Sequence, residues 1–191
     1  TATPLSAACP PHGSPALRRP AAFAGYADAI QSYLSAGGDL KMLRTKLTEW
    51  NAMSDDKKQV AAADLNGDGV EEVIVSVLDP EGFAIAPPGV LLVFECAQGA
   101  YARLYHEGSG ESESSGPSTR ILHVGNVTLD GLANVVYVLR TCGAHTCYER
   151  LRVIGWDGAQ LVDLMGDVLE FPYPSYSVEP GRIEAVSGGI G

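Results

Sequence analysis

A short segment of this chain carries oxygen-bearing side chains at alternate positions of a turn that contains two glycines. The segment reads Asp64-Leu65-Asn66-Gly67-Asp68-Gly69-Val70-Glu71-Glu72. Ca²⁺ takes roughly six to eight oxygen ligands, and alternate residues of a coiled loop can converge on a single ion. The spacing therefore predicts a calcium site. Its ligands would be the side chains of Asp64, Asn66, Asp68 and Glu72 and the backbone carbonyl of Val70.

Gly69 falls at the sixth position of this loop, where the chain must turn sharply and a Cβ would be unfavourable. An EF-hand would also carry a bidentate glutamate at position 12, but that position is Val75, within an apolar run over residues 73–78. We therefore expect the loop to lead into a strand. The alternative interpretation is an Asn/Asp/Gly hairpin turn that binds no metal.

A second and weaker copy of the loop lies further along the chain. Aligning Gly131 with Gly69 sets the two copies 62 residues apart, which indicates an internal repeat. The second loop keeps a single carboxylate at the equivalent positions, so we expect it to bind metal weakly or not at all. Its equivalent residues are Asn126, Thr128, Asp130 and Asn134.

Around each loop the sequence predicts four strands joined by turns. In the first copy, apolar residues fall on both faces of the second and third strands, which predicts sheets that are covered on both sides. The predicted strands cover residues 59–63, 72–78, 90–96 and 101–106 in the first copy, and residues 120–124, 134–140, 148–155 and 160–164 in the second.

The segment AADLNGDGVEEVIV, the repeat period near sixty residues and the four-strand unit together resemble the FG-GAP or VCBS repeat. That repeat occurs in integrin-type β-propellers and in many bacterial secreted proteins. The resemblance covers roughly residues 58–165. It implies a blade-like β-sheet, calcium held at Asp64, Asn66, Asp68 and Glu72, an extracellular setting and a binding or adhesion role without catalysis. The second loop departs from the family pattern because it lacks most of the acidic ligands.

Two repeats are too few to close a propeller, which typically needs about four to eight blades. Residues 176–186 look like the beginning of a third, degenerate unit with Gly181 at its turn, and the sequence stops at Gly191. Either the native chain continues, or the last sheet is covered by another part of the chain or by another subunit. An uncovered sheet edge or apolar face would otherwise invite pairing.

Two amphipathic stripes precede the predicted strands. The first has the spacing of one helix face, and Gly37-Gly38 predicts where that helix ends. Asp39 is the expected N-cap of a second helix. We expect the two helices to pack as an antiparallel hairpin on one sheet face. The stripes consist of Phe23, Tyr26, Ala27, Ile30 and Leu34, and of Leu40, Leu43, Leu47 and Trp50.

The sequence thus predicts a mainly β fold with an N-terminal helical hairpin, an α+β architecture. Two four-stranded antiparallel, propeller-blade-like units would be followed by a partial third. The expected segments are a Pro-rich arm (1–20), the helical hairpin (21–56), a first β unit (57–110), a Gly/Ser/Glu linker (111–118), a degenerate second unit (119–167) and a partial third unit or tail (168–191).

The chain has 191 residues and a formal net charge of −10. This charge argues against binding to nucleic acid or to anionic membranes, and is compatible with Ca²⁺ and with cationic partners. No apolar run approaches the ~20 residues of a membrane span, so we expect no membrane insertion. The first residues lack a basic and apolar leader, and we expect that a signal peptide has been removed.

Four cysteines in an acidic, glycine-rich chain indicate export to an oxidising compartment. Cys142 and Cys147 flank a short segment at a predicted hairpin tip, where a disulfide fits. Cys9 and Cys96 would then pair and tie the N-terminal arm to a strand of the first unit.

The alternative for the hairpin tip is a zinc site made by Cys142, His145 and Cys147, with a fourth ligand from His123, His106 or an acidic residue. The spacing is unlike the paired CxxC knuckles of zinc sites. It therefore favours the disulfide.

No nucleophile elbow, Walker loop, HExxH motif or strand-following GxGxxG motif is present in the sequence. Ser109 and its neighbours His106, Glu107 and Glu111 lie in or beside a Gly/Ser/Glu-rich stretch that we interpret as a solvated linker. We therefore expect no enzymatic activity.

The expected function is a secreted or cell-surface, calcium-stabilised module that binds a protein or glycan ligand. The alternative is a structural subunit of an extracellular fibre or surface layer, which would bind copies of itself.

Overall fold

The structure is a computed structural model of the chain, and it describes residues 9–11, 13–54, 57–82, 87–109, 116–143, 146–165 and 169–174. Several predicted segments lie outside these ranges: residues 1–8 of the arm, residues 111–115 of the linker, and residues 175–191 of the partial third unit.

Two helices precede the sheets, as the apolar stripes predict. After a short 3-10 turn at Phe23–Gly25, α1 spans Tyr26–Ser35 and α2 spans Leu40–Glu49. The connection turns at Gly37, whose φ of 82° lies in the left-handed region that glycine adopts without strain. The Asp39 carboxylate accepts the Met42 amide at 2.9 Å, which confirms Asp39 as the N-cap of α2.

The strands form two antiparallel meanders. The first sheet has the order β1-β2-β3-β4, and the second contains β5-β6-β7-β8 in sequence order. All eight predicted strands are present, and their ends differ from the prediction by no more than two residues. The observed strands are β1 Val60–Ala63, β2 Glu72–Leu78, β3 Gly89–Ala97, β4 Ala100–Gly108, β5 Ser118–Gly125, β6 Asn134–Cys142, β7 Thr146–Trp156 and β8 Leu161–Asp163.

The second sheet has a fifth strand that was not among the predicted ones. β9, Leu169–Pro174, pairs antiparallel with the first part of β7, from Thr146 to Leu151. β8 pairs with the last part of β7, from Ile154 to Trp156. The long strand β7 is therefore flanked by two short strands along its outer side.

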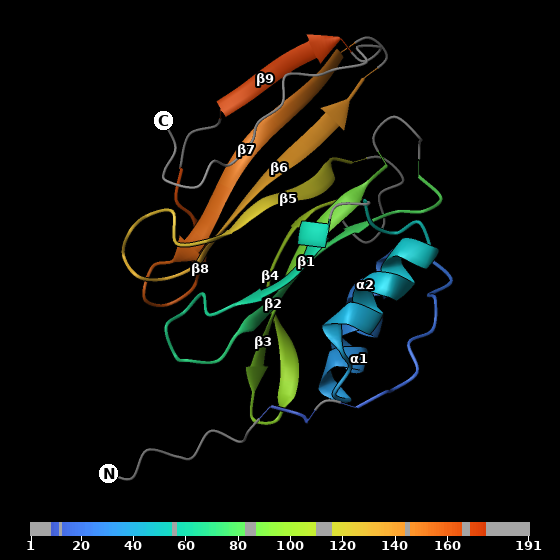
Figure 1. Cartoon of the computed structure of the whole chain (residues 1–191). Helices are drawn as coiled ribbons and strands as arrows, with labels where there is room; N and C mark the ends of the chain where they lie inside the picture. The colour runs from blue at the N-terminus through green and yellow to red at the C-terminus, as the bar shows by residue number, and fades with distance from the viewer. Residues whose placement is uncertain are drawn as a thin grey trace.

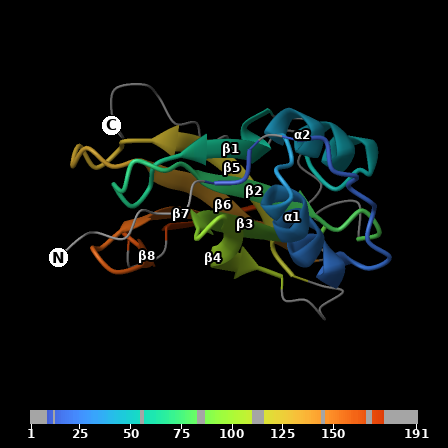
Figure 2. The ribbon, with the colours of Figure 1, turned by 90° about the horizontal axis from the view of Figure 1, so that it is seen from below.

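The helices and the two sheets form three layers, and β2 shows how the sequence produces them. Val73, Val75 and Val77 belong to the core shared with the helices, whereas the intervening Ile74 belongs to the core between the sheets. Figure 1 shows α1 and α2 on one side of the β1–β4 sheet and the β5–β9 sheet on its other side, and Figure 2 shows the same arrangement from below. Because successive side chains of a strand point to opposite faces, β2 contributes side chains to both cores.

The core between the sheets confirms that the first sheet is covered on both faces. A smaller apolar cluster lies on the outer face of the second sheet, and we call that surface the outer face below. The core between the sheets contains Leu65, Ile74, Leu91, Val93, Ile121, Val135, Tyr137, Leu139, Ile154 and Leu161. The outer-face cluster contains Leu122, Val136, Val138, Leu151 and Val153.

Two buried polar contacts join the sheets beside this apolar core. The Gln59 side chain donates to the carbonyl of Ile121 at 3.0 Å and accepts the Ile121 amide at 2.9 Å. The Ser76 hydroxyl donates to the Thr119 carbonyl at 2.9 Å. Since both contacts end on the backbone of β5, they fix the register between the first sheet and the edge strand of the second.

Candidate metal centre

The predicted calcium loop connects β1 to β2 and is held together by its own acidic and amide side chains. Asp64 accepts the Gly67 amide at 2.7 Å with one carboxylate oxygen and the Gly69 amide at 3.0 Å with the other. The side chain of Asn66 accepts the Asp68 amide at 2.9 Å, and the side chain of Asp68 accepts the Val70 amide at 2.7 Å. In both cases the donor lies two positions further along the chain. The side chains of these three predicted ligands are therefore bonded to the backbone of the loop itself.

Glycine is required at two points of this loop. Gly67 and Gly69 have φ values of 80° and 84°, in the left-handed region. With these two residues the chain coils tightly enough for the Asp64 carboxylate to reach both amides. The position of Gly69 agrees with the requirement for glycine that the sequence pattern predicted there.

Glu72 differs from the other acidic residues of the loop because it is buried. Its side chain points back into the loop, where it accepts the Leu65 amide at 2.7 Å and the Asn66 side-chain amide at 3.0 Å. Only 1% of the residue is exposed to solvent. Burial, and then the negative charges of Asp68 and Asp64, raise the pKa of the Glu72 carboxyl to about 7. The hydrogen bond from Leu65 opposes this rise, and the two charged groups that act on the carboxyl, Asp68 and Asp64, are both acidic.

The second loop, between β5 and β6, reproduces the geometry of the first at the positions that the repeat predicts. Asn126 accepts the Leu129 amide at 2.7 Å, and Asp130 accepts the Leu132 amide at 2.9 Å. Gly131 has a φ of 96°, matching Gly69, and Leu129 has a φ of 64° at the position of Gly67. The sequence did not indicate that leucine adopts this conformation, because non-glycine residues seldom do.

Asn134 takes the place of Glu72 in the second loop. It is equally buried, and its side-chain oxygen accepts the Val127 amide at 3.0 Å and the Thr128 amide and hydroxyl at 3.2 and 3.1 Å. A neutral amide oxygen thus accepts the same backbone hydrogen bond as the Glu72 carboxylate does in the first loop. The two loops lie side by side, since the Ala133 amide donates to the Asp64 carbonyl at 3.3 Å.

The donor set of the first loop fits Ca²⁺ in chemistry, because all of its groups are oxygens and three of them are carboxylates. Within the described ranges, no three His, Cys, Asp or Glu side chains are gathered closely enough to hold a metal as they stand. Calcium binding would therefore need the exposed Asp68 side chain and the half-buried Asp64 side chain to move toward Glu72. A carboxylate oxygen that accepts one amide keeps lone pairs for a cation.

Both predicted disulfides are present. Cys9 and Cys96 are joined, and so are Cys142 and Cys147 across the β6–β7 hairpin. This pairing corrects the zinc alternative, because a disulfide sulfur is not the thiolate that zinc requires. His145 lies outside the described residues.

A polar network between the sheets was not identified from the sequence. The Glu107 carboxylate accepts the hydroxyls of Tyr105, at 2.5 Å, and of Tyr137, and lies 3.6 Å from Arg152, which also pairs with Asp163. Burial, and then the hydrogen bond to Glu107, raise the pKa of both phenols, so the tyrosines donate and the carboxylate accepts. These residues come from four strands, and no sequence spacing brings them together.

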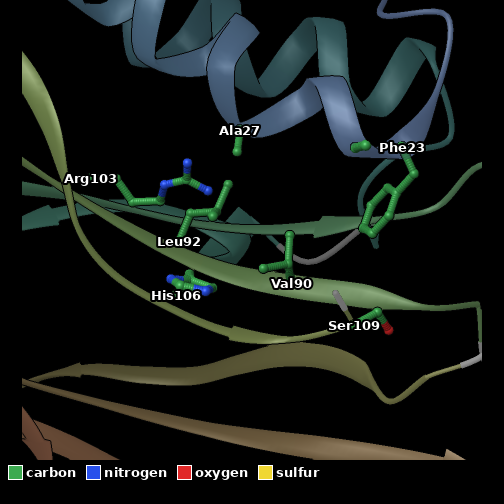
Figure 3. A pocket seen from close by; sticks show the side chains of 8 residues that line it. Phe23, Ala27, Val90, Leu92, Arg103, His106 and Ser109 are labelled. Carbon is green, nitrogen blue, oxygen red and sulfur yellow. The ribbon is translucent and has the colours of Figure 1, made fainter. Parts of the chain in front are cut away.

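A small pocket lies between α1 and strands β3 and β4, with a volume of about 90 Å³. Figure 3 shows Phe23, Ala27, Val90 and Leu92 lining it, with Arg103 and His106 on the strand side. Arg103 lies 3.8 Å from Asp28, and the Ser109 hydroxyl donates to the Pro117 carbonyl at 3.1 Å. Ser109 is 5% exposed, so this residue is buried and is not part of a solvated linker as expected from the sequence.

Comparison of the chain with protein-family models, with curated proteins and with solved structures found no match. Within its described part, the chain has no helix with the length and apolar character that crossing a bilayer requires.

Proposed function

We propose that this protein is a secreted or cell-surface binding module, without catalytic activity, whose first loop is stabilised by Ca²⁺. The observation that carries the calcium proposal is the buried Glu72 carboxylate, whose charged neighbours Asp64 and Asp68 are both acidic. A buried carboxylate beside two further carboxylates is costly to ionise, and a bound divalent cation lowers that cost. Asn134, at the equivalent place in the second loop, is neutral, so its burial does not call for a cation.

Asp64, Asn66, Asp68 and Glu72, with the carbonyl of Val70, would hold the ion. Calcium would supply two positive charges where the loop supplies three negative ones. This would lock the turn between β1 and β2 without taking part in a reaction.

The family proposal is supported by the repeat itself. Two four-strand meanders follow one another, each with an equivalent loop between its first two strands. We therefore propose that they are FG-GAP or VCBS-like units, each resembling one propeller blade. An extracellular setting is supported by the two disulfides, which persist in oxidising compartments.

The test of the calcium proposal is terbium luminescence with calcium competition in the Asp68→Ala variant. Asp130→Ala is a matched control, because Asp130 accepts the amide two residues on in the second loop just as Asp68 does in the first. Saturable binding should survive in the control and disappear in Asp68→Ala. An unchanged titration in Asp68→Ala would contradict calcium binding at this loop.

Thermal unfolding gives an independent readout of the same binding. A ligand that binds only the folded state at 100 times its Kd stabilises it by about 2.7 kcal/mol. Calcium should therefore raise the Tm of the wild-type protein and of Asp130→Ala, and leave the Tm of Asp68→Ala unchanged.

The second candidate function is a structural subunit of an extracellular assembly. It is favoured by the repeat array, because the described part of the chain contains two meanders and a propeller closes with about four to eight blades. Light scattering after size exclusion, with excess calcium and with chelator, separates the two functions. A monomer in both conditions supports the binding module, and large species support the assembly.

A further inference from the structure

The calcium loop forms one wall of a groove of about 470 Å³ that faces the helical hairpin. On the loop side the groove is lined by Gly69, Val70 and Glu71, and on the opposite side by the turn between α1 and α2. This volume lies in the range of sites that hold small ligands or a few residues of a peptide, roughly 300 to 1,000 Å³. The remaining lining residues include Pro10, Pro11, Leu34, Leu40, Val73 and Tyr101.

The wall opposite the loop is fixed by covalent and close backbone contacts. The disulfide to Cys96 anchors Cys9 at one end of the groove, and the Gly13 amide donates to the Gly37 carbonyl at 2.7 Å. A Cβ on Gly37 would lie 2.1 Å from the Pro11 carbonyl oxygen, so the arm and the helical turn are in direct contact. This side of the groove cannot move without breaking those contacts.

The floor of the groove is held in a similar way. The Ser35 hydroxyl of α1 accepts the Tyr101 amide at 3.0 Å and so joins the helix to the β4 backbone. Val73 is buried in the core beneath the helices. The loop segment Gly69–Glu71 is thus the part of the wall that changes if the loop binds an ion, because the Gly69 amide is bonded to the Asp64 carboxylate.

The charge of the groove selects its occupant. None of the described residues that line it is basic, and the exposed Glu71 carboxylate lies on its rim. Most other lining groups are apolar side chains or glycine backbone. A ligand that fits must therefore bring a positive charge to Glu71 and an apolar group to the floor, which a lysine or arginine beside an apolar residue in an extended peptide does.

We propose that this groove binds an extended segment of a protein partner in which a lysine or arginine stands next to an apolar residue, and that calcium in the adjoining loop strengthens this binding. The proposal rests on the proposed function, since the calcium loop is one wall of the groove. It also gives the binding module a partner class: a cationic and amphipathic peptide rather than a glycan or an anionic ligand.

The experiment uses two probes, acetyl-Ala-Leu-Lys-Ala-amide and acetyl-Ala-Leu-Glu-Ala-amide, titrated into the ¹⁵N-labelled full chain with calcium and with chelator. The lysine peptide should shift the amide signals of Gly69, Val70 and Tyr101 in a saturable way, with at least five-fold tighter binding in calcium. The glutamate peptide should not bind at either condition.

Glu71→Gln should weaken the lysine peptide at least five-fold. The control is Glu81→Gln, which removes an exposed carboxylate that pairs with Arg19 in the β2–β3 connection, at the end of β2 opposite to the calcium loop. This control should bind the peptide as the wild type does. Terbium luminescence on the same samples reports whether the loop itself takes up metal.

Metal uptake without peptide binding, or equal binding of the two peptides, overturns this proposal and leaves the calcium module standing. Peptide binding that is the same with calcium and with chelator overturns the coupling. If terbium also fails to bind in that case, the proposed calcium function fails separately.

Discussion

Glu72 and Asn134 occupy the same place in two copies of one loop, and each accepts the backbone amide of the residue seven positions before it. The Leu65 amide lies 2.7 Å from a Glu72 oxygen, and the Val127 amide lies 3.0 Å from the Asn134 oxygen. Both residues are 1% exposed. The two loops therefore share a fold and differ in one buried charge, and this difference can be tested in both directions.

In the metal-free protein, the free energy of unfolding should fall as the pH rises from about 4.5 to about 7. The pKa of Glu72 is raised to about 7, so over this interval the folded state holds a proton that the unfolded chain has released. Stability falls with pH wherever the folded state binds more protons. At about 1.4 kcal/mol per pH unit, the loss amounts to about 3 kcal/mol.

Urea unfolding in the presence of chelator, measured between pH 4.5 and 8, checks this dependence. Glu72→Gln is the control, because it keeps the shape of the side chain and cannot ionise. The wild type should be destabilised relative to Glu72→Gln as the pH rises, and calcium should remove the difference at pH 8. Parallel curves for the two proteins would show that Glu72 does not carry the effect.

The reciprocal change is Asn134→Asp, which keeps the size of the side chain and introduces a buried charge into the second loop. The Asn134 Nδ2 atom has no hydrogen-bond partner among the described residues, so a carboxylate oxygen in its place would be buried without a donor. We expect a loss of about 2 kcal/mol at pH 8 and little loss near pH 4, where the carboxyl is neutral. Equal stability of wild type and variant at pH 8 would contradict the explanation given for Glu72.

The two disulfides should contribute unequally to stability. The cysteines of the Cys9–Cys96 bridge are 87 residues apart in sequence, and those of the Cys142–Cys147 bridge are 5 apart. On the chain-entropy estimate, replacing the first pair with serine costs about 4 to 5 kcal/mol and replacing the second costs about 2 kcal/mol at most. Equilibrium urea unfolding of the two double variants measures both, and a larger effect of the hairpin bridge would rule out this account.

Removing the acceptor at the centre of the polar network should cost more than removing one of its donors. Glu107→Ala leaves the hydroxyl of the fully buried Tyr137 without its carboxylate partner. Tyr137→Phe removes the hydroxyl itself, so no buried donor is left without an acceptor. We expect about 2 to 3 kcal/mol for Glu107→Ala and about 1 kcal/mol for Tyr137→Phe. In the double variant the losses should be less than additive, because the two residues act in one network. Additive losses by urea unfolding would mean that the two side chains are independent.

Much of the architecture follows from local signals in the sequence. The helix stripes, the Asp39 cap and the eight strands were predictable because each depends on periodicity or on a turn residue within a few positions. The equivalence of the two loops was also predictable, since Gly69 and Gly131 align them.

Contacts between distant segments could not be predicted in the same way. Glu107 meets Tyr137 and Arg152 because two separate sheets stack, and sequence spacing does not encode that packing. The burial of Glu72 is a further example: its identity marked it as a ligand, but its enclosure depends on the neighbouring loop and core. β9 was missed because it pairs with the first part of β7, which β8 leaves unpaired. That pairing depends on the length of β7 and not on a local pattern in β9.

The Gln59 side chain has a consequence for how this protein avoids aggregation. A strand at the edge of a sheet offers unpaired amides and carbonyls that another chain can pair with. On β5 the amide and carbonyl of Ile121 are already taken by a single glutamine side chain. The molecule thus closes the middle of that edge with one buried side chain, and Gln59→Ala would leave the Ile121 amide and carbonyl unpaired in the interior.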